Sequence, residues 1–170
     1  MKYLLLILLL LNSCSVKVNI KENRVDKLSH TLMNVGIKKD VSTRLSKDIF
    51  YKTKQLAKKF KLVSPPLWHN FLVNIGVRKK GLCYNWSDSL FGYLKNRDYK
   101  NVKFHLIGAN IGNYWSEHNA LMISVDNLEF KNSIIIDPWR NSGELFFTHI
   151  KDDKDYEWKE RFYRERFVNL

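Results

Sequence analysis

The chain has 170 residues and a formal net charge of +12 at pH 7. One domain of ordinary size accounts for that length, and neither internal repeats nor long linkers divide it. A charge this high bears on solubility and partners and not on fold. It makes anionic lipid headgroups and cell-wall polymers candidate neighbours.

The first residues have the pattern of a secretory signal peptide. Lys2 supplies a positive charge, and Leu4–Leu11 is a run of Leu and Ile too short to span a membrane. Leu-Asn-Ser-Cys at 11–14 resembles a bacterial lipobox, in which the Cys is diacylated and becomes the mature N-terminus. We expect a signal peptide over 1–13, lipidation at Cys14, and a membrane-anchored lipoprotein on the outer side of the membrane, which is the periplasmic side in a Gram-negative cell. For such an exported chain we expect no nucleic-acid partner.

Hydrophobic periodicity predicts a helical first half. Residues 14–24 are polar and indicate a tether, and the domain itself is predicted over 25–170. Gly36 is expected to end the first helix, and Ser42 to be the N-cap of the second. The helices are predicted over 25–35, 42–60, 67–75 and 83–96.

The second half has the alternating and continuous apolar runs of strands. These strands are predicted over 102–109, 119–125, 133–137 and 145–150. The tail, with Trp158, Phe162 and Phe167 among many charges, is predicted as a packed C-terminal helix. Helices followed by antiparallel strands predict an α+β fold.

Cys83 begins the fourth predicted helix and is a candidate nucleophile. It shares the inward face of that helix with Trp86 and Leu90. The positive end of the helix dipole lowers the pKa of a thiol in the first turn, which favours the reactive thiolate. If Cys14 carries lipid, Cys83 is the one thiol left in an oxidising compartment, where it has no disulfide partner.

His118 and Asp137 are predicted to meet across a hairpin. A four-residue loop over 126–129 pairs Val125 with Phe130, and the same register pairs His118 with Asp137. Paired residues share a face and lie about 5 Å apart at Cβ, whereas a slip of one residue would place them on opposite faces. The hairpin thus predicts a carboxylate beside an imidazole.

The three residues are predicted to form a catalytic triad. Asp137 would orient the imidazole, and His118 would accept the thiol proton and later deliver it to the leaving group. The backbone amide of Cys83 is expected to supply half of an oxyanion hole. Asn85, His69 and Trp68 are candidates for the second donor.

At these residues the chain resembles the transglutaminase-like superfamily, whose core is papain-like. Cys83, His118 and Asp137-Pro138 match its order of a Cys at a helix start, a His on the next core strand and an Asp before Pro. The strings Gly-Leu-Cys-Tyr-Asn-Trp, Glu-His-Asn-Ala and Asp-Pro-Trp-Arg-Asn-Ser-Gly are similar to those of little-characterised bacterial exported proteins. The resemblance covers about residues 81–148 and implies acyl-thioester chemistry without naming a substrate.

The predicted function is that of an exported cysteine peptidase or amidase acting on peptide or protein amides of the cell envelope. Amide transfer to an amine, and a binding module without catalysis, are the alternatives. Trp139 is expected to cover the triad, and Arg140 to bind a substrate carboxylate or make a structural contact. We expect no cofactor and no metal, because no phosphate-binding glycine motif is present and four histidines lack ligand spacing: His30, His69, His105 and His149.

The lipobox predicts acyl chains on an N-terminal Cys14, which mass spectrometry of the mature protein will detect. Cys14→Ser should release the protein from membranes into the soluble fraction, because the anchor is the lipid. An unmodified N-terminus at another residue would refute both expectations.

Overall fold

The computed structural model describes residues 16–162 and 164, which form an α+β domain. The predicted signal peptide and Cys14 lie outside the described residues. The helices are α2 (Glu22–Asn34), α3 (Lys39–Lys59), α4 (Pro66–Asn74) and α5 (Cys83–Lys95), with short 3-10 turns η1 (Phe130–Asn132) and η2 (Ile150–Asp152). The strands are β1 (Lys103–Ala109), β2 (His118–Ser124), β3 (Ile134–Asn141), β4 (Glu144–His149) and β5 (Lys159–Glu160).

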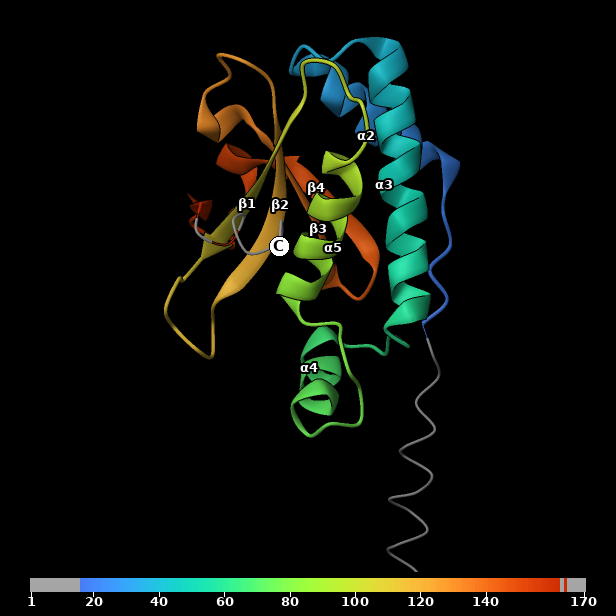
Figure 1. Cartoon of the computed structure of the whole chain (residues 1–170), viewed down its shortest axis with the longest axis vertical. Helices are drawn as coiled ribbons and strands as arrows, with labels where there is room; N and C mark the ends of the chain where they lie inside the picture. Colours follow the sequence, from blue (N-terminus) through green and yellow to red (C-terminus); the bar gives the residue numbers. More distant parts are fainter. Residues whose placement is uncertain (1–15, 163, 165–170) are drawn as a thin grey trace, which may run out of the picture.

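The five strands form one antiparallel sheet in the order β4-β3-β2-β1-β5. Figure 1 shows α5 against this sheet, α3 alongside α5, and α4 beside the start of α5. The helical layer buries the main core, in which Trp86, Leu90 and Leu94 of α5 pack with Leu121 and Ile123 of β2. The predicted fold class is therefore confirmed as α+β.

The other face of the sheet has a smaller core. Ala120 and Met122 alternate with the helix-facing residues of β2, and they pack with Ile135 and Trp158. Trp158 lies in the C-terminal segment, just before β5 pairs with β1. The predicted C-terminal helix is therefore wrong over 154–160, because this segment covers the sheet and adds a strand to it. Phe167 of that prediction lies outside the described residues.

Two predicted boundaries also change. Ser42 is not the N-cap of α3, because the helix starts at Lys39 and the buried Ser42 hydroxyl donates to Ile37 O at 3.2 Å. The predicted tether includes the start of α2, and Val16 and Val18 pack against the main core. Among the described residues, no helix is long and apolar enough to cross a membrane.

The predicted hairpin register is wrong by two residues. The structure pairs Leu121 with Ile136 and Ile123 with Ile134, so Asp137 lies diagonally from His118 and not directly across from it. The turn η1 lengthens the connection that we expected to be a tight four-residue loop. A shift of two preserves the side-chain face, so the prediction that His118 and Asp137 share a face is confirmed.

The α5–sheet contact predicts a large cost for truncating a helix residue in the core. Leu90 is fully buried, and Leu90→Ala should lower the free energy of unfolding by about 2–5 kcal/mol through lost burial and a cavity. Chemical denaturation of both proteins measures the difference. Leu67→Ala is the control, because Leu67 is 70% exposed and its truncation should change stability by less than about 0.5 kcal/mol. Equal changes in the free energy of unfolding for the two variants would contradict the packing of Leu90 in the core.

Candidate active site

The three predicted site residues meet at one end of the sheet, where β2 begins. Cys83 is the first residue of α5, His118 is the first residue of β2, and Asp137 lies where the pairing of β3 becomes irregular. His118 belongs to the strand face that points away from the helices, whereas its neighbour Asn119 points toward them. At this strand end, side chains from both faces reach Cys83.

His118 and Asp137 form a buried hydrogen bond. The distance from His118 Nε2 to Asp137 Oδ2 is 2.7 Å, and the two side chains are 2% and 1% exposed. Because Nε2 faces the carboxylate, the bond favours the tautomer that carries its proton there. His118 Nδ1 is buried without a hydrogen-bond partner among the described residues, so it is the nitrogen available to exchange a proton with the thiol.

The Asp137 carboxylate has further partners on its own strand. Oδ1 accepts hydrogen bonds from the backbone N–H groups of Trp139 and Arg140 at 3.1 and 3.2 Å. Arg140 Nε donates to Oδ2 at 3.1 Å. These donors fix the position of the carboxylate and compensate its loss of water.

Arg140 is held by carboxylates on more than one side. It contacts both oxygens of Asp153, at 3.0 and 2.7 Å, and Asp155 at 3.2 Å, in addition to Asp137. Its guanidinium also lies over the ring of Phe146 at 3.9 Å. These contacts occupy the guanidinium, so they favour a positioning role for Arg140 over the predicted contact with a substrate carboxylate.

Aromatic rings surround the imidazole of His118. Trp139, Tyr156 and Trp158 have ring centroids 4.8, 4.6 and 5.4 Å from it. Trp139 thus lies over the triad as predicted, and its Nε1–H donates to Asn70 of α4 at 3.0 Å. Tyr156 and Trp158 come from the segment that the sequence wrongly predicted as helix. The rings keep water from the imidazole and so strengthen its interaction with Asp137.

Cys83 lies at a capped helix start. Asn85 Oδ1 accepts the backbone N–H groups of Gly81 and Leu82 at 2.9 and 3.1 Å, which fixes the chain as it enters α5. The backbone N–H of Cys83, in the first turn, has no acceptor within the helix. It is therefore free to bind an anion near the sulfur.

Asn119 is a site residue that the sequence analysis missed. Its Nδ2 lies 3.6 Å from Cys83 Sγ, while its Oδ1 accepts hydrogen bonds from Arg161 and Arg164 at 2.7 and 3.0 Å. Glu117 accepts from both Asn119 and Arg161. A signal was present, since Asn119 follows His118 directly, but alternation along the strand placed it on the opposite face.

The residues predicted as possible second oxyanion donors have other contacts. Asn85 presents its oxygen to the helix start. His69 Nε2 lies 3.0 Å from Lys80 O, and its Nδ1 accepts the Val63 N–H at 3.3 Å. Trp68 stacks on Phe71. The geometry favours Asn119 for this role.

The thiol and the imidazole shift each other's pKa in the direction that forms an ion pair. Burial alone raises the pKa of the Cys83 thiol, but His118 and hydrogen bonds from Asn119 outweigh it, so the pKa lies below its ordinary value. Burial alone lowers the pKa of His118, but Asp137 and Cys83 raise it to about 9.

The raised pKa of His118 makes the stability of the fold depend on pH. Because the pKa of about 9 exceeds the roughly 6.5 of a free imidazole, the protonated ring contributes its full free energy to folding below about pH 6.5. This contribution is lost as the pH rises through about 9.

A surface pocket of about 440 Å³ opens beside Cys83. Cys83 and Asn119 line it, together with residues of α4 and of the segment 110–117. Cys83 is 9% exposed, whereas His118 is 2% exposed and does not line the pocket. The Cys83 thiol is therefore reachable from the pocket, whereas the imidazole of His118 is buried beside it.

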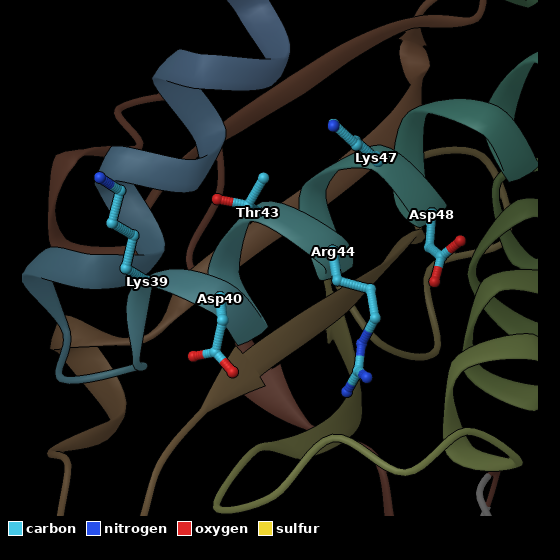
Figure 2. A pocket seen from close by; sticks show the side chains of 6 residues that line it. All are labelled: Lys39, Asp40, Thr43, Arg44, Lys47 and Asp48. Carbon is cyan, nitrogen blue, oxygen red and sulfur yellow. The ribbon is translucent and has the colours of Figure 1, made fainter.

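A second depression lies on α3, away from the triad. Figure 2 shows that its lining side chains come from successive turns of one helix and do not converge: Lys39, Thr43 and Lys47 point one way, and Asp40, Arg44 and Asp48 the other. We assign no function to it. Within the part of the chain that the structure describes, no group of three or more His, Cys, Asp or Glu residues is arranged to hold a metal ion.

The chain has no match among protein-family models, curated proteins or solved structures. The resemblance to the transglutaminase-like superfamily therefore stays a prediction.

The lowered thiol pKa predicts fast alkylation of Cys83 by iodoacetamide below about pH 8.5, where an ordinary thiol reacts slowly. The pH dependence of the alkylation rate measures the thiol pKa. His118→Ala should move this pKa upward, because it removes the main group that lowers it. The matched control is His30→Ala, whose histidine lies on α2 outside the site. An ordinary thiol pKa that His118→Ala leaves unchanged would show that the two groups are not coupled.

Proposed function

We propose that the protein is a cysteine hydrolase, a peptidase or amidase, of the transglutaminase-like superfamily with a papain-like core. The observation that carries the proposal is the His118–Asp137 hydrogen bond of 2.7 Å beside a thiol of lowered pKa. A helix that starts at the nucleophile and packs on strands bearing the base and the acid supports the same fold family.

The reaction begins with transfer of the thiol proton to His118 Nδ1. The thiolate of Cys83 attacks the carbonyl carbon of an amide, forming a C–S bond, and the carbonyl oxygen becomes an oxyanion. The Cys83 N–H and Asn119 Nδ2 are the donors placed to stabilise that charge. The C–N bond then breaks, and the nitrogen leaves as an amine with the proton from His118.

Hydrolysis of the thioester completes the cycle. Neutral His118 accepts a proton from water as the water oxygen attacks the acyl carbon. The C–S bond breaks, the carboxylic acid leaves, and the thiolate–imidazolium pair returns. Asp137 holds the imidazole throughout.

The N-terminal residues support a proposed location and substrate class. The signal-like run and the lipobox-like Cys14 favour a lipid-anchored protein of the cell envelope, with envelope peptides or proteins as substrates. A binding module without catalysis is the alternative. The buried His118–Asp137 hydrogen bond beside a thiol of lowered pKa weighs against it.

Turnover of p-nitrophenyl acetate by the full-length protein tests the proposal. Cys83→Ala should abolish the burst of p-nitrophenolate, because the acyl group has no acceptor. Asp137→Asn should lower the rate on the order of 10⁴-fold through a misplaced histidine proton. Asp126→Asn makes the same chemical change at an exposed residue and should leave the rate unchanged.

Circular dichroism of each variant separates lost chemistry from lost structure. Folded Cys83→Ala protein that retains the wild-type burst would refute the assignment of the nucleophile. An Asp137→Asn rate equal to that of Asp126→Asn would refute the role of the carboxylate.

A further inference from the structure

We propose that the pocket beside Cys83 binds the acyl part of the substrate and selects a bulky, uncharged apolar or aromatic group next to the scissile carbonyl. The inference rests on the proposed function, because it assumes that Cys83 attacks that carbonyl. Beyond that function, it assigns the class of acyl group that the protein prefers and the pocket residues that select it.

The position of His118 decides which part of the substrate enters the pocket. The leaving amine must lie next to His118, from which it takes a proton. His118 does not line the pocket, whereas Cys83 and Asn119, which hold the carbonyl carbon and its oxygen, do. The leaving nitrogen therefore lies where the thiol meets the buried imidazole, and we assign the pocket to the group on the other side of the carbonyl.

Exposed apolar side chains form two walls of the pocket. Leu67 and Phe71 of α4 are 70% and 48% exposed, and Tyr114 and Trp115 on the opposite segment are 81% and 88% exposed. So much exposed apolar surface around one cavity is typical of a binding site. An apolar or aromatic group between these walls would remove that surface from water.

The backbone of the wall formed by the segment 110–117 is held in place by hydrogen bonds. In the segment 110–117, Glu117 N–H donates to Asn113 O at 2.7 Å, and Gly112 N–H donates to the Glu117 carboxylate at 2.9 Å. The rings of Tyr114 and Trp115 pack edge to face with centroids 5.1 Å apart. The backbone that carries these two rings is therefore ordered before a substrate binds.

The charges around the pocket favour an uncharged group. The chain has 29 Lys and Arg residues, but none of the described residues that line the pocket is one of them. The one acidic lining residue, Glu117, is paired with Arg161. A charged substrate group would lose its water here without finding a free partner of opposite charge.

Acylation by the p-nitrophenyl esters of N-acetylated Phe, Ala and Asp tests the proposal on the full-length protein. All three share one leaving group, so their rates report the acyl group alone. The burst of p-nitrophenolate gives the acylation rate constant, and mass spectrometry locates the acyl group on Cys83. We expect the Phe ester to react at least about tenfold faster than the Ala ester, and the Asp ester to be the slowest.

Substitutions locate the selectivity. Trp115→Ala and Phe71→Ala should each reduce the ratio of the Phe to the Ala rate several-fold, while alkylation by iodoacetamide, which has no acyl side chain, stays unchanged. Tyr51→Ala is the matched control, because Tyr51 is 54% exposed and lies on α3 outside this pocket. It should leave the ratio at the wild-type value.

The outcomes separate this inference from the proposed function. Equal rates for the three esters, no acylation by any of them, or a Phe preference that survives both pocket substitutions would overturn the acyl-group assignment. If iodoacetamide still reports a thiol pKa that depends on His118, the hydrolase proposal survives such a result. An ordinary thiol pKa independent of His118 would overturn the hydrolase proposal instead.

Discussion

The buried hydrogen bond between Asp137 and His118 is the interaction on which the rest of the site depends. A carboxylate that is 1% exposed has lost its water, and removing one partner of such a buried pair typically costs about 3–5 kcal/mol. The protein compensates with two backbone N–H groups and with Arg140. Because all these donors converge on Asp137, the imidazole has one orientation and one nitrogen left for Cys83.

The site has a dry side, where aromatic rings enclose His118, and an open side, where a pocket reaches Cys83. On the dry side, Trp139, Tyr156 and Trp158 surround the imidazole and keep its interaction with Asp137 strong. On the open side, Cys83 and Asn119 line a pocket that solvent can enter. The aromatic side fixes the imidazole, and the open side leaves the thiol accessible from the pocket.

The C-terminal segment assembles much of this environment. Asp153 anchors Arg140, Tyr156 and Trp158 contact the imidazole, and Arg161 and Arg164 hold the oxygen of Asn119. Fixing that oxygen leaves the Asn119 amide nitrogen directed at the sulfur. Residues far from the triad in sequence therefore orient both the base and a proposed oxyanion donor.

The sequence by itself determined the helices, four of the strands and the convergence of Cys83, His118 and Asp137. Periodicity reports burial, and a two-residue alternation keeps His118 and Asp137 on one face even when the register shifts by two. Tertiary structure decided the diagonal pairing of β2 with β3, the strand β5 in place of a helix, the ion pairs of Arg140 and the turn of Asn119 toward Cys83. No local pattern encodes the last three features, because each arises where segments distant in sequence meet.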